Sequence, residues 1–354
     1  MIGPTPSSSS STRGFVDRPR SADGGRGTCA AKRVKSIPSR QVPGVIVGTW
    51  WGQANSSCSP YRWRWGVETS SKGVILAGID DTPNSWLAAD WAATEAELRG
   101  SALRLVHAVG PGPEIGYDET GADLTRQVFE TVTGMLDESR ARIGASHPSL
   151  SIDAFVAHDR PAEAILDAAE DADLIVVGTR GRGGFAGLLL GSVSRRVAAH
   201  ADRPVVVVRE PRRNAADDGI VLGVRDDRDE EAARFAFAMA ARRRTSVRLV
   251  HAWSPVTQVE LAVRHVDALD EQQRAHRAVL NRVARPTADF PQVPVETELV
   301  RDSPTAALVA ASKRAALVVV PRHPAEGRLG LHLGTVTHAV LHHAECSVAI
   351  VPTG

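Results

Sequence analysis

The sequence after residue 72 repeats itself at an interval as long as a whole domain. Residues 103–108 read LRLVHA and residues 247–252 read VRLVHA, and other matching segments keep offsets of 143 to 145 residues. A repeat this long indicates a duplicated domain, because solenoid repeats have periods of about 20 to 50 residues. With 354 residues, the chain has room for two domains that each bury a core of their own.

Each copy alternates short apolar runs, which are typical of buried strands, with segments of helical periodicity. In the first copy we expect strands at 74–79, 103–109, 151–156, 174–177 and 205–208. In the second copy we expect strands at 220–224, 247–252, 317–320 and 346–351. Strands that alternate with helices predict crossover units and a parallel sheet. The predicted fold class is therefore α/β, with two tandem doubly wound α/β/α domains at 71–211 and 217–354.

Residues 1–70 differ in composition from the rest of the chain. A serine run at 7–11 is followed by Gly, Pro, Arg and Ser up to residue 40, so this segment offers little to a core. An aromatic group at 50–65 is the exception, and a small adhesive patch or peptide-binding lid is the alternative interpretation. We expect residues 1–70 to be a disordered extension, or one that is not part of the native protein.

Charge, hydropathy and cysteine content exclude several classes of function. The formal net charge is +1, which gives no basic surplus for nucleic acid, and no apolar run is long enough to span a membrane. The three cysteines form neither a zinc spacing nor a CxxC pair, so we expect a reduced, cytoplasmic environment. The excess of arginine over lysine, with abundant alanine, is typical of a GC-rich bacterial genome.

A glycine-rich loop follows the fourth strand of the first copy. Gly178 and Gly181 allow close approach of the backbone, and Gly191-Ser192 opens a helix whose amides and positive end favour phosphate. In a doubly wound sheet, ligands bind outside the carboxyl ends of the strands. Asp80 and Val106 stand at the ends of two neighbouring strands. We therefore expect Asp80 to meet a ribose or base, and the backbone of Val106 to meet the base edge.

Each of these residues also has a purely structural interpretation. Asp80 can be an N-cap, the glycines can be turn residues, and Ser192 can cap a helix. No GxxxxGK[ST] motif occurs, and the G-x-G-x-x-A match at 181–186 lacks the acidic residue of a dinucleotide site. No catalytic residues are predicted, because no nucleophile and general base come together. His338 and His342 have a metal-binding spacing without a third ligand, so no metal site is predicted either.

These residues resemble the universal stress protein family. Gly178, Gly181, Gly191 and Ser192 match the G-x2-G-x9-G-[S/T] spacing of its ATP-binding members, and GIDDTPNS at 78–85 adds to the match. The resemblance implies five-stranded parallel sheets of order 3-2-1-4-5, like those of adenine nucleotide alpha hydrolases, commonly paired through the last strands. It implies ATP as the ligand, with or without Mg²⁺. The implied site residues are Asp80, Val106, Val177, Gly178, Arg180, Gly181, Gly191, Ser192, Val193 and Ser194.

The second copy departs from this motif. Pro321 and Pro324 replace the first two glycines, and Arg225 replaces Asp80. Proline lacks an amide N–H and has a fixed φ, so we expect the second domain to bind ATP weakly or not at all and to act as a packing partner.

We expect a nucleotide-dependent stress-response or signalling module, with its two domains paired intramolecularly or the chain paired as a homodimer. A slow ATP hydrolase and a non-binding scaffold are the alternatives. Turnover with Mg²⁺ distinguishes the hydrolase, and the effect of ATP on the melting temperature distinguishes the scaffold.

Overall fold

The computed structural model describes residues 73–110, 119–181, 190–210, 219–254, 265–323 and 333–353. The chain divides into two units, Met1–Thr49 and Trp50–Gly354, and every described residue belongs to the second unit. The extension expected at residues 1–70 lies outside the described residues, so that expectation stays a prediction. Below, residues 73–210 are called the first half and residues 219–353 the second half.

Strands and helices alternate along both halves, as the apolar runs predict. The strands of the first half are β1 (Val74–Gly78), β2 (Ala102–Val109), β3 (Ile152–His158), β4 (Leu174–Gly178) and β5 (Val205–Val208). Its helices are α1 (Pro83–Arg99), α2 (Glu119–Ser146), α3 (Pro161–Ala168) and α4 (Ser192–His200).

The second half repeats this order of elements. Its strands are β6 (Ile220–Val224), β7 (Val247–Ala252), β8 (Val295–Val300), β9 (Leu317–Arg322) and β10 (Ser347–Pro352). Its α-helices are α5 (Glu230–Arg243), α6 (His265–Val283), α7 (Pro304–Ser312) and α8 (Thr335–His343). Two short 3₁₀ helices, η2 (Asp227–Asp229) and η3 (Arg285–Asp289), precede α5 and β8.

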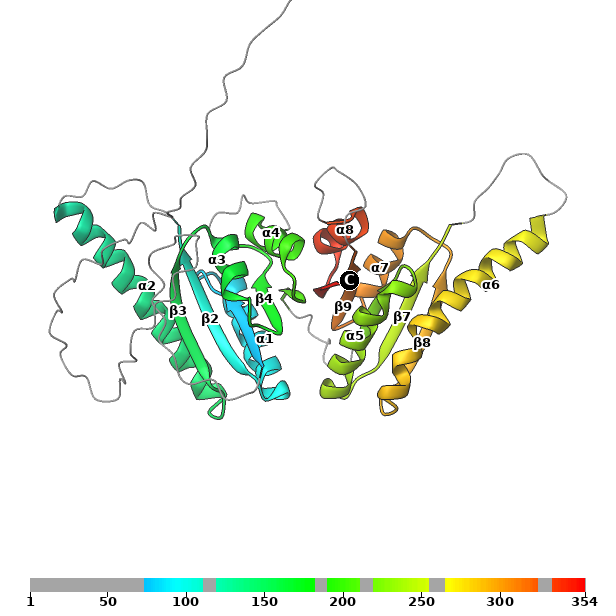
Figure 1. The fold of residues 1–354 in the computed structure, drawn as a ribbon, viewed down its shortest axis with the longest axis horizontal. Coiled ribbons are helices and arrows are strands. Elements are labelled where there is room, and N and C mark those ends of the chain that lie inside the picture. Colours follow the sequence, from blue (N-terminus) through cyan, green and yellow to red (C-terminus); the bar gives the residue numbers. More distant parts are fainter. Residues whose placement is uncertain are drawn as a thin grey trace, which may run out of the picture. The chain divides into compact units, whose positions relative to one another are not determined.

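The described strands form one sheet of ten in the order β3-β2-β1-β4-β5-β10-β9-β6-β7-β8. Within each half every pairing is parallel, and the order is 3-2-1-4-5, as the family resemblance implies. Only β5 and β10 pair antiparallel, with Val206 opposite Ala349, so the two five-stranded sheets join at these edges. Figure 1 shows β2 beside β3 in the first half, with α2 running along the outer side of β3.

Successive strand residues point to opposite faces of the sheet, so each face has its own core. Ile75 and Ala77 pack on the side covered by α1 and α2, whereas Leu76 packs on the side of α3 and α4. In the second half, α5 and α6 contribute to the first of these cores, and α7 and α8 to the second. Because both faces are covered, the central strands are apolar throughout, which explains their continuous Val/Ile/Leu runs.

A buried glutamate links α1 to α5. Glu95 is fully buried, and its carboxylate lies 2.6 Å from Arg99, 2.8 Å from Arg243 and 3.7 Å from Arg242. Burial lowers the pKa of Arg242, and so do its cationic neighbours Arg99 and Arg243. One carboxylate thus holds three guanidinium groups together, so removing it would leave several half-buried positive charges uncompensated.

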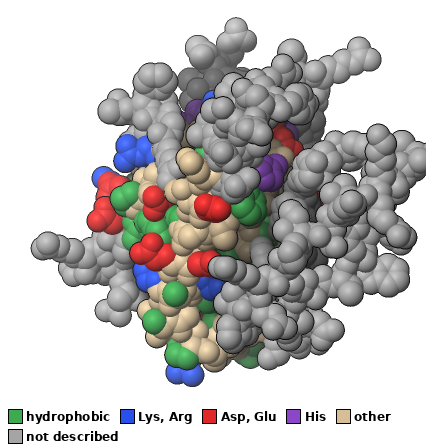
Figure 2. Space-filling model, turned by 90° about the vertical axis from the view of Figure 1, so that its left-hand side faces the viewer, with side chains coloured by type: hydrophobic (Ala, Val, Ile, Leu, Met, Phe, Trp, Pro, Cys, Tyr) green, Lys and Arg blue, Asp and Glu red, His purple; other side chains and the backbone are tan. Residues whose placement is uncertain are grey.

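The described part of the outer end of the first half carries charges of both signs. Figure 2 looks onto that end and shows acidic, basic and apolar side chains interspersed on the described part of the face. Leu98 and Val128, 41% and 42% exposed, are the described large apolar side chains most open to solvent. Scattered apolar residues of this kind are normal on a protein surface and do not mark a docking site.

Candidate functional site

The loop after β4 is held against the start of α4 by two hydrogen bonds. The Gly191 amide donates to the Thr179 carbonyl at 2.7 Å, and the Ser194 hydroxyl donates to the Gly178 carbonyl at 2.6 Å. A Cβ on Gly178 would lie 2.7 Å from the backbone carbonyl oxygen of Asn84, so only glycine fits there. Gly178 is required because α1 passes directly over the end of β4.

Asp80 lies against the same loop from the end of β1. A Cβ on Gly181 would stand 2.1 Å from Asp80 Oδ2, so the aspartate and the loop backbone are in direct contact. Asp80 Oδ1 accepts hydrogen bonds from the Thr82 hydroxyl at 2.6 Å and from the Thr82 amide at 3.3 Å. The N-cap of α1 is Thr82 rather than Asp80, which leaves the aspartate at the crevice.

Helix α4 begins without a side-chain cap. Gly191 is its N-cap, and within the described part of the chain the first-turn amides receive no side-chain cap. These amides, with the positive end of the helix dipole, form the standard arrangement for binding an anion. Ser192 is exposed, Val193 is half-buried, and Ser194 is buried beneath them. The sequence-based expectation that a helix opens at Gly191-Ser192 is confirmed.

Val106 and Val177 lie beneath this crevice rather than at its mouth. Val106 is 1% exposed and its carbonyl accepts a hydrogen bond from the Ile79 amide at 2.8 Å. Val177 is 3% exposed, one residue before the end of β4. Its position supports the loop, whereas the contact of Val106 with a base stays a prediction. His107 donates from Nδ1 to the Ile79 carbonyl at 2.7 Å, which holds this buried histidine within the sheet.

Positive charge gathers at the loop. Arg180 is exposed, and within the described residues its guanidinium forms no ion pair. Burial lowers the pKa of Arg209, and the nearby charge of Arg180 lowers it further against the opposing effect of Cys346. Arg196, in contrast, pairs with Glu163 at 2.6 Å on the outer face of α4. The free arginine therefore lies where an anion would meet the α4 amides.

The equivalent crevice of the second half is built differently. Pro321 is buried in β9, where it pairs with Val351, and it has no amide to offer. Arg225 follows β6 at the position that Asp80 has after β1, and it is exposed. Gly334 begins α8 as Gly191 begins α4, although no atom lies within 4 Å of a Cβ placed on it. Pro324 lies outside the described residues.

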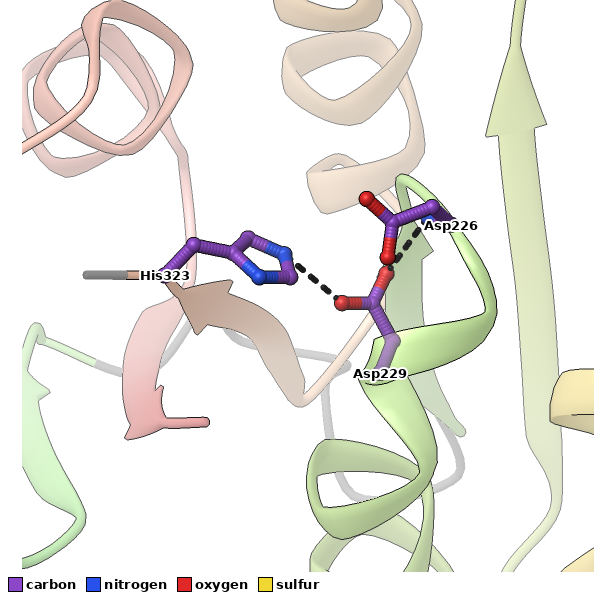
Figure 3. A group of neighbouring side chains, drawn as sticks. All are labelled: Asp226, Asp229 and His323. Atoms are coloured by element: carbon purple, nitrogen blue, oxygen red, sulfur yellow. Dashed lines mark hydrogen bonds and ion pairs between the residues drawn. The ribbon is translucent and has the colours of Figure 1, made fainter. Parts of the chain in front are cut away.

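Three side chains that sequence reasoning missed meet at the second crevice. They are Asp226 and Asp229, which follow β6, and His323, which follows β9; Figure 3 shows the histidine and Asp226 on either side of Asp229. The ligand atoms of the three lie within 4.8 Å of one another. The acidic spacing D-x-x-D after a strand, with a histidine after the neighbouring strand, is the signal that could have revealed them.

Burial and hydrogen bonding shift the pKa values of the two carboxylates in opposite directions. Burial raises the pKa of Asp229, against the lowering effect of hydrogen bonds from the Arg225 and Asp226 amides. The hydrogen bond from the Arg228 side chain lowers the pKa of Asp226 to about 2. Asp226 is therefore a stable anion, whereas ionised Asp229 needs a nearby cation to offset its burial.

Known proteins match this architecture over both halves. The family model described as the universal stress protein family matches residues 73–209 and again 218–352. A universal stress protein of Mycobacterium tuberculosis, Rv2005c, is 33% identical over 294 residues, which cover 78% of this chain and 96% of that protein. Another from the same organism, Rv2623, is 32% identical and covers 79% of this chain and 96% of its own length.

A solved structure of a universal stress protein from Archaeoglobus fulgidus has the same fold. It aligns with a TM-score of 0.57 at 16% identity, covering 80% of this chain and all of that chain. Fold and sequence together define a tandem α/β protein with a glycine loop in its first half. The chain belongs to the universal stress protein family. Among the described residues, every helix is too short or too polar to cross a membrane.

Proposed function

We propose that the first half binds ATP, with or without Mg²⁺, and that the protein acts as a nucleotide-dependent stress-response or signalling module in the cytoplasm. The observation that carries this proposal is the uncapped start of α4 lying against the loop of Gly178 and Gly181, which Asp80 contacts from the end of β1. Phosphates would meet the first-turn amides of α4, and the exposed Arg180 would neutralise part of their charge. Asp80 would accept hydrogen bonds from the ribose.

The second half serves in this proposal as a packing partner that binds ATP weakly or not at all. Pro321 removes one amide from its loop, and His323 stands where the first half has Arg180, so both a donor and a permanent positive charge are missing. The antiparallel register of β5 with β10 and the burial of Glu95 among arginines of α5 support intramolecular pairing of the two halves.

Calorimetric titration of ATP into the full chain and into the variant Gly181→Pro tests the proposal. The wild-type chain should bind one ATP. The variant, which has proline at residue 181 as the second half has at residue 324, should lose most of its affinity for ATP. The variant Gly334→Ala is the matched control, because open space surrounds that position. Equal ATP affinity in wild type and Gly181→Pro would contradict the proposal, provided that both melt cooperatively without nucleotide.

A further inference from the structure

The cluster of Asp226, Asp229 and His323 lies at the carboxyl ends of β6 and β9, apart from the nucleotide crevice of the first half. Asp229 is fully buried, and the His323 side chain is only 7% exposed. His323 Nε2 and Asp229 Oδ1 stand 2.8 Å apart, yet neither atom makes a hydrogen bond within the described part of the chain. The two atoms form an ion pair when the histidine is protonated, and otherwise they need a cation to join them.

The hydrogen bonds around the histidine hold its ring in place. The Thr353 hydroxyl donates to the Arg322 carbonyl at 3.3 Å, and its oxygen lies 3.1 Å from His323 Nδ1, which can donate to it. His323 Nε2 then faces the carboxylate oxygen of Asp229 and offers a lone pair to a cation whenever it carries no proton. Metal-binding histidines are typically fixed in this way, by donating from the other ring nitrogen.

Asp229 is held in place by its second oxygen. Asp229 Oδ2 accepts hydrogen bonds from the Arg225 amide at 2.6 Å and from the Asp226 amide at 3.1 Å. Oδ1 is thereby aimed at His323 with no hydrogen bond of its own. A lone pair and a carboxylate at this distance repel each other unless a cation joins them. A shared proton fits poorly, because the two atoms do not meet the geometry of a hydrogen bond.

We propose that Asp229, His323 and Asp226 form a site for a divalent cation of the first transition row. One imidazole nitrogen with carboxylate oxygens favours ions such as Zn²⁺ and Mn²⁺ over the all-oxygen sites of Ca²⁺. Metal–ligand bonds of about 2.0 to 2.2 Å place neighbouring ligands about 3.3 to 3.6 Å apart in a tetrahedral site and about 2.8 to 3.1 Å apart in an octahedral one. The 2.8 Å between Nε2 and Oδ1 fits the octahedral spacing.

Asp226 completes the site by a small rotation. Its carboxylate now pairs with the exposed Arg228 side chain at 2.9 Å and lies 3.7 Å from Arg225. Both arginine side chains are about half exposed, 48% and 59%, so they can turn into solvent when the cation takes their place. The cation thus occupies in the second half the end of the sheet at which the first half is proposed to bind phosphates.

The test uses the full chain, purified without a histidine tag, stripped with a chelator and titrated with Zn²⁺ in the absence of nucleotide. The wild-type chain should bind one Zn²⁺ per molecule at this site. His323→Gln and Asp226→Asn should each weaken the binding at least tenfold. Asp226→Asn keeps the fold testable, because that side chain is only partly buried. The double variant His338→Gln/His342→Gln, at an exposed and a half-buried position of α8, is the matched control and should bind like wild type.

Co²⁺ provides the spectroscopic readout. Its visible absorption should appear with wild type and with the α8 control, and it should change or vanish in His323→Gln. Two outcomes would overturn the proposal. One is a wild-type chain that binds neither Zn²⁺ nor Co²⁺, which would show the pair to be joined by a proton. The other is binding that survives in His323→Gln and disappears in the α8 variant.

Discussion

Replacing Gly191 with alanine is the substitution that best distinguishes the nucleotide crevice from its counterpart in the second half, because the matching change there should leave ATP binding intact. A Cβ at residue 191 would lie 3.3 Å from the Thr179 carbonyl oxygen, 3.4 Å from Arg180 Cα and 3.8 Å from the Gly181 amide nitrogen. The new methyl group would crowd the loop backbone and push it by a few tenths of an ångström. The corresponding substitution, Gly334→Ala, meets no atom within 4 Å.

The two alanine substitutions should cost similar stability and very different affinity. Both residues are helix N-caps without a side-chain cap, with φ of −75° and −61°, so neither needs the conformational freedom of glycine. Alanine at an N-cap costs a few tenths to about 1 kcal/mol relative to glycine. In Gly191→Ala, the displaced loop also loses about one hydrogen bond to charged phosphate, or about 1.5 to 3 kcal/mol. That loss corresponds to a Kd for ATP about 10- to 150-fold higher.

Isothermal titration of ATP into the two variants and wild type measures this difference, with thermal melts in buffer as the stability control. Gly334→Ala should bind ATP as wild type does. If Gly191→Ala also retained the wild-type Kd while melting normally, the phosphates would not lie between α4 and the loop, and the reasoning would fail.

Two further predictions concern stability. Glu95→Ala should lower the free energy of unfolding by about 3 to 5 kcal/mol, because it leaves three half-buried arginines without the buried carboxylate that they share. Glu97→Ala removes an exposed carboxylate that pairs with His147 and should cost less than about 1 kcal/mol. Equal losses in denaturant titrations would contradict this. Burial first, and then the charge of His276, lowers the pKa of His251 in the folded chain. The unfolded chain therefore binds more protons than the folded chain below about pH 6.5, and the free energy of unfolding falls as the pH drops below that value. His251→Asn keeps a donor for the Val224 carbonyl and should flatten the fall in melting temperature between pH 7.5 and 5.5; an unchanged slope would refute the assignment.

The strands and their order were predictable because burial on both faces leaves a continuous apolar signature. Runs such as 174–177 and 205–208 lie in β4 and β5, and Gly100 ends α1 with φ of 63°, a conformation that glycine adopts without strain. β8 was not predicted. It lies at the edge of the sheet, and its sequence VETELV alternates with charges that leave most of the strand partly exposed.

The crevice of the first half could be predicted because all its parts lie in one motif and at two strand ends. The Asp226, Asp229 and His323 cluster could not be predicted in the same way. Its members are far apart in sequence and come together only because β6 and β9 are neighbours. The ring of His323 is held in place by Thr353, which follows β10. Such a site depends on three-dimensional register, which no local pattern encodes.

The most direct test of the central proposal is a crystal structure of the full chain grown with ATP and Mg²⁺. The triphosphate should lie against the amides at the start of α4 and the backbone of Gly178 and Gly181, with the crevice of the second half free of nucleotide. A first-half crevice without nucleotide, or a nucleotide seated beside His323 instead, would contradict the account.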